Sequence, residues 1–294
     1  MIHLVDASVF VFRAWFSIPD RMSDGEGRPV NAVYGYTGFL CDLLERVRPS
    51  HLAVAFDESL TTSFRNEIYP QYKANRELPP AELERQFGFC REITGALGIR
   101  HFAHERFEAD DIIGTLAWRC RAEAMPSTIV SRDKDLAQLL RTGDVFLNPV
   151  DDVSYQYRDI AGKFGALPER LADYQALVGD KVDNIAGVPG IGAKTAAALM
   201  SQYESLESLF DNLDEVETLP IRGARSVARR LREHRDAAFL ARELTRIVTD
   251  MPMTVTTQDL RLRRPDEAAV TGLFDRLGFG PRLRQQLARL AAGS

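Results

Sequence analysis

Residues 105–114 read ERFEADDIIG, which places three carboxylates, Glu108, Asp110 and Asp111, within four positions. Apolar residues then recur at helical spacing, so the two aspartates are expected in the first turn of a helix, where the helix dipole tolerates negative charge. A single carboxylate is enough to cap a helix. Three such neighbours repel one another and need a counter-ion, of which a divalent metal ion is the simplest. The stretch therefore predicts a capped helix or one part of a metal site.

The composition is that of a soluble globular protein: 294 residues, 45% hydrophobic and 27% charged, enough for one large domain or two modest ones. No apolar run approaches the roughly 20 residues that cross a bilayer, and no basic segment of a signal peptide precedes the first strand. The three cysteines are widely spaced in apolar helical contexts: Cys41, Cys90 and Cys120. They predict reduced core thiols in a cytoplasmic protein without membrane attachment, not disulfides or a zinc site.

The formal net charge of -5, taken alone, argues against nucleic acid as a partner. Where the acids lie matters more than their sum. Nine of them are singled out below as one candidate site, and the rest of the chain without them is net positive. An acidic pocket loaded with metal inside a mildly basic surface is compatible with DNA, so the global charge does not decide the partner.

Three short apolar runs have the length and composition of buried parallel strands: Ile2–Val5, His51–Phe56 and Ser127–Val130. Each leads into aspartates, in order Asp6, Asp57, and Asp133 with Asp135. A helical pattern over 35–47 joins the first two runs into a strand–helix–strand unit. Open parallel sheets carry their sites at the carboxyl ends of the strands. One aspartate there is often only a turn or cap residue, but the repetition favours a shared site.

Further elements are expected on either side of this unit. A long amphipathic helix is predicted over about 81–97, and short strands over 145–148, 154–157 and 253–257. From about residue 161 the pattern changes to helices joined by short turns.

The stretch Ser63–Arg76 is basic, interleaved with aromatic rings and poor in aliphatic residues. It fits a solvated loop, or a surface that binds a phosphate backbone and stacks on bases. Lys73 and Arg76 could supply positive charge to a scissile phosphate.

Residues 187–196 form a glycine turn that enters an alanine-rich helix. Gly190 and Gly192 let the backbone approach a ligand closely, and the helix N-terminus offers free N–H groups. The turn lies between two helices, so it does not fit a dinucleotide fold; it fits a helix-hairpin-helix that grips a phosphate backbone without reading bases. A basic face follows that is either solvated or in contact with DNA: Arg222, Arg225, Arg229 and Arg230.

The nine candidate acids are Asp6, Asp57, Glu108, Asp110, Asp111, Asp133, Asp135, Asp180 and Asp183. Ligation by oxygen alone selects Mg²⁺ or Mn²⁺ over zinc. The set exceeds what one Mg²⁺ uses, and two ions about 4 Å apart account for it better. Such a pair suits in-line hydrolysis of a phosphodiester.

With these motifs, the chain resembles the 5'-nuclease family, which includes the 5'-3' exonuclease domain of bacterial DNA polymerase I, phage 5'-exonucleases and flap endonucleases. The matching pieces occur in family order over about residues 1–255: Val5–Ala7, Ala55–Asp57, Phe64–Arg65, Tyr72–Arg76, Glu108–Asp111, Arg132–Asp135, Gly179–Asp180, Asp183–Asn184 and Gly187–Gly192. The resemblance implies an α/β fold with a mostly parallel central sheet flanked by helices. Residues 1–172 would form a PIN-like catalytic domain with a helical arch at about 64–89, and residues 173–294 a helix-hairpin-helix domain with C-terminal helices.

The resemblance also implies roles for individual residues. The first metal would be held by Glu108, Asp110, Asp111 and Asp133, with Asp6 and Asp57 nearby. The second would be completed by Asp135, Asp180 and Asp183. Lys73, Arg76 and Asp133 would be catalytic. K⁺ would be bound by the backbone carbonyls of Leu177, Val178, Ala186, Val188 and Ile191. DNA would contact Arg65, Tyr72, Lys73, Arg76, Gly187, Gly190, Gly192, Lys194 and Thr195.

The expected function is therefore a two-metal 5'-3' exonuclease or flap endonuclease of DNA replication or repair. Its substrate would be DNA with a 5' flap, a nick or a free 5' end; it would act as a monomer, and a DNA polymerase is a candidate partner. One alternative is a non-catalytic protein that binds structured DNA on the same scaffold, which the intact acid set disfavours because those charges repel DNA. Another is a PIN-type ribonuclease, which the helix-hairpin-helix and the basic arch disfavour.

Overall fold

The computed structural model describes residues 1–58 and 62–292. Its centre is a six-stranded sheet in the order β3-β2-β1-β4-β5-β6, parallel except for β6. The strands are β1 (Ile2–Asp6), β2 (His51–Asp57), β3 (Arg100–His104), β4 (Ser127–Val130), β5 (Val145–Asn148) and β6 (Val153–Gln156). In β1 and β2 the side chains are almost all buried, as expected for strands covered on both faces. The predicted fold class is confirmed.

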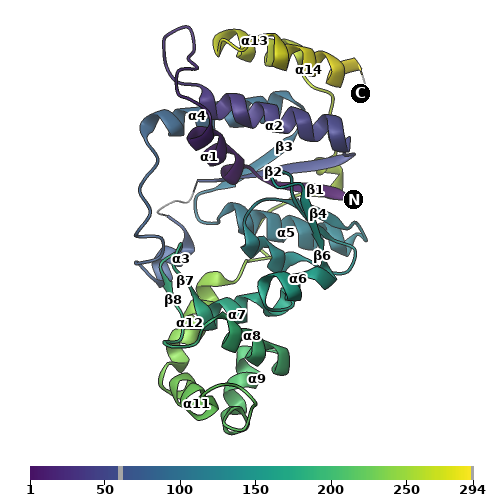
Figure 1. The fold of residues 1–294 in the computed structure, drawn as a ribbon. Helices are drawn as coiled ribbons and strands as arrows, with labels where there is room; N and C mark the ends of the chain where they lie inside the picture. Colours follow the sequence, from purple (N-terminus) through teal and green to yellow (C-terminus); the bar gives the residue numbers. More distant parts are fainter. Residues whose placement is uncertain (59–61, 293–294) are drawn as a thin grey trace.

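Helices cover both faces of the sheet (Figure 1). One face carries α1 (Ala7–Ser17), α2 (Asn31–Val47) and α4 (Ala81–Ala96), packed on inward side chains such as Val54 and Phe56. The other face carries α5 (Ala109–Ala122), packed on Leu4 and Ala55. Alternate side chains of each strand therefore enter different cores, as the period of two requires.

A smaller helical lobe continues from the α5 face (Figure 1). After α6 (Tyr157–Phe164) its helices are α7 (Leu171–Val178), α8 (Ala193–Gln202), α9 (Leu206–Asp211), α10 (Leu213–Val216), α11 (Ala224–Glu233) and α12 (Arg235–Thr245). A two-stranded hairpin, β7 (Gly179–Asp180) and β8 (Ile185–Ala186), separates α7 from α8. The lobe and the α5 face of the sheet share one continuous hydrophobic core, so the lobe is firmly attached to the strand ends.

The last two helices, α13 (Glu267–Arg276) and α14 (Pro281–Ala292), pack against α4 and α2 on the far face of the sheet. Figure 1 shows them beside α2, at the opposite end of the molecule from α11. The division into 1–172 and 173–294 stays a prediction; these two helices pack on the helices of the sheet and not on the helical lobe. Among the described residues, no helix has the length and apolar character needed to cross a membrane.

The local structure adds to or differs from the predictions in three places. Residues 253–257 form no strand; they lead into a short 3-10 helix, Thr257–Leu260. Strand β3 was missed, because an edge strand that reads RHFAH shows no apolar alternation. The predicted arch includes α3 (Phe64–Ile68), but from Ala81 onwards it is the first half of α4. There the buried Gln86 fixes α4 to α2 by accepting the N–H groups of Ala32 and Val33.

Candidate active site

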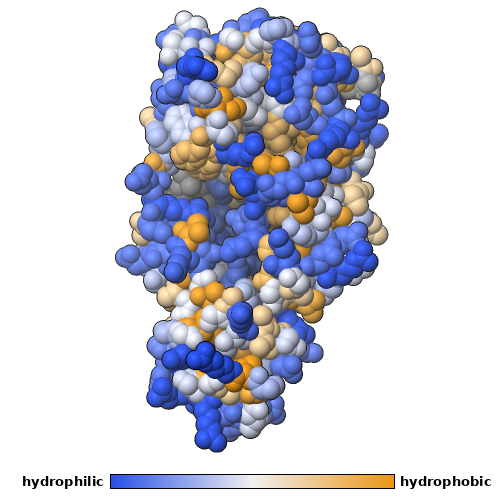
Figure 2. All heavy atoms as spheres, in the orientation of Figure 1, coloured by the Kyte–Doolittle hydropathy of each residue, from blue (hydrophilic) through white to orange (hydrophobic). Residues whose placement is uncertain are grey.

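Eight of the nine predicted acids line one pocket at the carboxyl ends of the parallel strands: Asp6, Asp57, Glu108, Asp110, Asp133, Asp135, Asp180 and Asp183. The pocket lies between the sheet and the helical lobe, and its cations are Arg65, Lys73 and Arg76. The face seen in Figure 2 is mainly hydrophilic, with a hollow between the larger part of the molecule and the lobe. Eight carboxylates therefore face three cationic side chains.

Strand ends and helix starts fix the acids in place. Asp6 ends β1 and accepts a 2.9 Å hydrogen bond from the hydroxyl of Ser131, directly after β4. Asp57 ends β2 and accepts a 2.8 Å hydrogen bond from the N–H of Ala109, the first residue of α5. Three neighbouring elements are thereby joined at one edge of the sheet, which is where the repeated strand-end aspartates predicted a site.

Three of the acids, Asp6, Asp110 and Asp135, are not fully compensated by positive charge. Burial, followed by the charges of Asp57 and Asp133, raises the pKa of Asp6 to about 8. Burial and the charge of Asp133 raise the pKa of Asp135 to about 7, and the pKa of Asp110 is raised well above its usual value for the same kinds of reason. Each shift means that the folded protein disfavours the ionised form.

These shifts predict how the stability of the metal-free protein depends on pH. A carboxyl with a raised pKa binds its proton more tightly in the folded state, so its stabilising contribution is present at low pH and is lost as the pH rises through the folded pKa. In EDTA, the melting temperature of the wild type should therefore fall by several degrees between about pH 6 and pH 9. The Asp6→Asn variant should show a shallower fall, and an equal slope in both proteins would contradict the assignment of this effect to Asp6.

Lys73 is the main counter-charge on the open side of the pocket. Its ammonium lies 2.8 Å from Glu108 Oε2, and its side chain is 13% exposed. Burial alone would lower the pKa of Lys73, but the charges of Glu108 and Asp183 outweigh it and hold the pKa above its usual value. Arg76 forms an ion pair with Asp183 and its side chain is 42% exposed. Both cations are fixed by acids yet remain within reach of a ligand.

Asp111 is not part of the pocket, which corrects its prediction as a metal ligand. It is fully buried, and Arg65 donates to both of its oxygens, at 2.7 and 2.8 Å. The N–H groups of Glu108 and Val248 donate to the same oxygens. With four donors in place, this carboxylate ties α5 to α3 and to the segment after α12, a structural role.

Arg65 and Tyr72 are also misplaced as DNA contacts, since each is only 3% exposed. The Arg65 guanidinium already donates hydrogen bonds to Asp111 and to the backbone carbonyls of Leu244 and Arg246. The Tyr72 hydroxyl donates to Glu108 at 3.1 Å. Both lie in the wall of the pocket, where the tyrosine positions an acid and cannot stack on a base.

Several supporting residues carried no pattern in the sequence. The Ser8 hydroxyl accepts the N–H of Asp57 at 3.1 Å, and the side-chain amide of Gln175 donates to Asp135. Val9 and Phe12 of α1 add apolar contacts to the same pocket. Isolated serines, glutamines and aromatic residues are common everywhere, so only the folded structure identifies them as parts of the site.

The glycine turn adopts the expected tight hairpin. A Cβ on Gly187 would lie 2.3 Å from the carbonyl carbon of Val178, so only glycine allows the two segments to touch. Gly190 has a φ of +76°, and its carbonyl accepts a 3.1 Å hydrogen bond from Arg230 of α11. Gly192 and Lys194 are exposed and Thr195 is half-buried at the start of α8. The turn and the basic face of α11 therefore form one surface.

The acid pocket fits a hard cation by the chemistry of its donors. Asp6 Oδ1 is buried and has no hydrogen-bond partner among the described residues. Such an oxygen, among carboxylates with raised pKa values, needs a positive charge. Within residues 1–58 and 62–292, no group of three or more His, Cys, Asp or Glu side chains is placed so that it could hold a metal ion as it stands. The acids line the pocket wall, and hydrogen bonds to Ser131 and Lys73 hold two of them there.

Comparison with known proteins agrees with this geometry. Residues 1–165 match the family described as 5'-3' exonuclease, N-terminal resolvase-like domain, and residues 166–268 match 5'-3' exonuclease, C-terminal SAM fold. DNA polymerase I of Bacillus caldotenax is 38% identical over 94% of this chain, which spans 31% of that relative. The chain thus covers about a third of the length of the polymerases that it matches.

Solved structures of similar fold include zinc-bound T5 5'-exonuclease, with a TM-score of 0.66 and 19% identity over 99% of this chain and 98% of that one. The bacteriophage T5 D15 flap endonuclease, in a complex with DNA and metal ions, has a TM-score of 0.67 and 19% identity over the same shares of the two chains. At this identity the likeness concerns the fold.

Proposed function

Because the chain belongs to the 5'-3' exonuclease family and is therefore a nuclease, we propose that it cuts DNA at a 5' flap, a nick or a free 5' end with the help of two divalent metal ions. The observation that carries the proposal is the meeting of eight carboxylates in one pocket at the strand ends. The acids come from segments up to 177 positions apart, and acids crowded in one pocket with perturbed pKa values are typical of a functional site.

We assign the metal ligands as the sequence suggested, without Asp111. The first ion would be held by Glu108, Asp110 and Asp133, with Asp6 and Asp57 nearby, and the second would be completed by Asp135, Asp180 and Asp183. Oxygen donors of this kind suit Mg²⁺ or Mn²⁺. The chemistry that the two ions would supply is activation of a water molecule and stabilisation of the leaving oxygen in an in-line displacement.

Lys73 and Arg76 are the proposed partners of the scissile phosphate. They are the cations on the open side of the pocket, whereas Arg65 is buried beneath it. Since Glu108 and Asp183 already hold their side chains, little ordering is needed when a phosphate arrives. Their positive charge would stabilise negative charge that develops on the phosphate during cleavage.

Replacing Lys73 by alanine is expected to lower the turnover of a labelled 5'-flap by about 10²–10³-fold and to leave flap binding near normal. The reason is that one charge at the reacting phosphate matters more in the transition state than in the ground state. Single-turnover cleavage and binding measured in Ca²⁺ separate the two effects. Lys181→Ala, which removes an exposed lysine nearby, serves as the control. Equal losses in binding and turnover would refute the role given to Lys73.

The turn from Gly187 to Gly192, with Lys194 and Thr195, is proposed to grip the phosphate backbone of duplex DNA. A K⁺ ion would join this contact through the carbonyls of Leu177, Val178, Ala186, Val188 and Ile191. Two observations support the ion site. Gly187 brings the two carbonyl-bearing segments into van der Waals contact, and a 2.9 Å hydrogen bond from the N–H of Val188 to the carbonyl of Leu177 fixes their relative position.

Gly190→Val is expected to weaken flap binding and to reduce the slope of its salt dependence, since fewer phosphates would be neutralised. Valine disfavours a φ of +76°, so the backbone of the turn is strained, and the Arg230 guanidinium, which would lie 2.0 Å from the new Cβ, must move away. Binding titrations between about 50 and 200 mM salt measure the slope. Gly25→Val, in an open loop with nothing within 4 Å, is the matched control. An unchanged slope would remove the turn from the DNA interface.

The function itself is tested with the wild-type protein on end-labelled 5'-flap DNA, nicked DNA and single-stranded RNA, each in Mg²⁺, Mn²⁺ or EDTA. We expect cleavage of DNA near the junction with either metal and none in EDTA. Tight DNA binding without cleavage would instead identify a binding protein on this scaffold. Preferential cleavage of RNA would identify a ribonuclease. The proposal includes a cytoplasmic monomer that acts beside a DNA polymerase, and the polymerase I relatives support that partner.

A further inference from the structure

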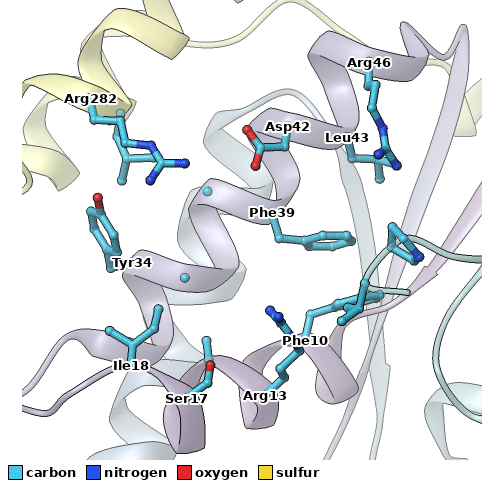
Figure 3. Close-up of a pocket in the computed structure, with 16 residues that line it drawn as sticks. Phe10, Arg13, Ser17, Ile18, Tyr34, Phe39, Asp42, Leu43, Arg46 and Arg282 are labelled. Atoms are coloured by element: carbon cyan, nitrogen blue, oxygen red, sulfur yellow. The ribbon is translucent and has the colours of Figure 1, made fainter. Parts of the chain in front are cut away.

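A second pocket lies on the other side of α1 from the acids (Figure 3). Its volume is about 590 Å³, within the usual range for small-molecule sites. It is bounded by α1, α2, the start of α14 and the turn between β5 and β6. Val9 and Phe12 of α1 face the acid pocket, while Phe10 and Arg13 face this one. The two pockets are therefore separated by the thickness of one helix.

The wall of the second pocket is aromatic. Phe39 of α2 stacks on Phe10 of α1, with ring centroids 3.8 Å apart and planes inclined by 12°. Tyr34 packs edge-on against Phe279, 5.5 Å between centroids, and faces the same space from the opposite side. Rigid rings on two sides of a cavity offer a planar ligand surfaces to pack against.

Three arginines from three different elements point into this pocket: Arg13, Arg46 and Arg282 (Figure 3). Only Arg46 has an ion pair described in the structure, a 3.6 Å contact with Asp152, whose side chain is 87% exposed. The one acid in the lining is Asp42, and it accepts a 2.6 Å hydrogen bond from Gln286. The pocket thus has an excess of positive charge that the described residues do not neutralise, in a form suited to phosphate.

Gly38 supplies an independent observation. Glycine weakens a helix interior, yet α2 carries two glycines near its middle. Gly35 is explained by packing, since a Cβ there would lie 2.5 Å from Ile18 and 2.6 Å from Ala14 of α1. Gly38 has no such reason, because its Cβ would meet only a methyl group of Leu283, 4.0 Å away. Gly38 lines the pocket, and the space that a side chain would fill there belongs to the pocket.

We propose that this pocket is a nucleotide site, in which the arginines bind the phosphate and the aromatic wall packs against the base. The inference goes beyond the proposed nuclease function, because none of the acids or cations of the active site takes part. The nucleotide could be free in solution or could belong to bound nucleic acid, and both have the same chemistry.

The test is calorimetric titration of the whole chain with dAMP in EDTA, where the uncompensated acid pocket repels the ligand. Inorganic phosphate and deoxyadenosine, each half of the ligand, should bind at least tenfold more weakly than dAMP. Gly38→Leu, which fills the wall, and the double variant Arg13→Gln with Arg282→Gln should each weaken dAMP binding at least tenfold. Arg158→Gln, an exposed arginine on α6 with an 81% exposed side chain, should change nothing.

Gly38→Ala is the control for misfolding, because alanine favours the helix. This variant should have a melting temperature equal to or above that of the wild type and should still bind dAMP more weakly. A DNA hairpin is then added in EDTA as a competitor. If the hairpin prevents dAMP from binding, the nucleotide belongs to nucleic acid. If dAMP binds equally well with the hairpin present, the ligand is a free nucleotide. Binding of dAMP no tighter than phosphate, or binding unchanged in both the glycine and arginine variants, would overturn the proposal. Cleavage of flap DNA plays no part in this test, so its outcome is separate from that of the proposed function.

Discussion

Asp110→Asn is expected to lower the rate of flap cleavage by about 10³-fold while leaving the metal-free protein at least as stable as the wild type. Asp110 lies in the first turn of α5, and burial with the charges of Asp133 and Asp6 raises its pKa well above the usual value. Asparagine keeps the shape and removes the charge that a cation needs. The same change relieves repulsion among the acids, so loss of function and gain of stability should come together.

The measurement is single-turnover cleavage at saturating protein in Mg²⁺, with thermal melting in EDTA. Asp236→Asn is the matched control, because it makes the same change at an exposed acid on α12, away from the pocket. Its cleavage rate should stay within about twofold of the wild type. If Asp110→Asn retained more than a tenth of the wild-type rate, the pocket would not be the site of metal-dependent cleavage.

The strand-end acids were predictable because parallel strands deliver their carboxyl ends to the same edge of a sheet. The ends of β1, β2 and β4 follow directly from their apolar runs, so the order of residues alone is enough to place Asp6, Asp57 and Asp133 together. Likewise, the glycine turn has few conformations open to it, and its position between helices indicated a hairpin.

Asp111 shows where such reasoning fails. Successive residues on a helix point about 100° apart, so two adjacent aspartates point in different directions and one of them can leave the pocket. The sequence alone does not tell which of the two faces inward. That depends on Arg65, which comes from a segment 46 positions away and reaches Asp111 only in the folded chain. A pattern of charges records that acids are crowded, but not which of them is neutralised.

The packing partner of the C-terminal helices was not predictable for a related reason. The amphipathic pattern of α14 predicts a buried face that includes Leu283 and Leu287. It does not specify the partner, and any exposed apolar face would satisfy it. In the structure that partner is α2, which lies more than 200 positions earlier in the chain.

The buried pair of Arg65 and Asp111 leads to the second prediction with a large effect. Arg65→Ala is expected to lower the free energy of unfolding by about 3–5 kcal/mol, because it leaves a fully buried carboxylate without its partner. Two further contacts are lost, since Arg65 also donates to the carbonyl of Leu244 in the last turn of α12 and to that of Arg246 directly after it. Urea unfolding followed by circular dichroism measures the change.

Two further variants distinguish a buried charge from mere loss of a side chain. Arg106→Ala breaks an exposed ion pair with Glu67, whose atoms are 2.8 Å apart, and should cost less than about 1 kcal/mol. The double variant Arg65→Met with Asp111→Leu removes both charges, so it should recover most of the stability lost in Arg65→Ala. It should also keep measurable flap cleavage, because neither residue reaches a metal in our assignment. A double variant that is as unstable as Arg65→Ala would show that the hydrogen bonds to the backbone, and not the buried charge, hold the helical lobe against the sheet.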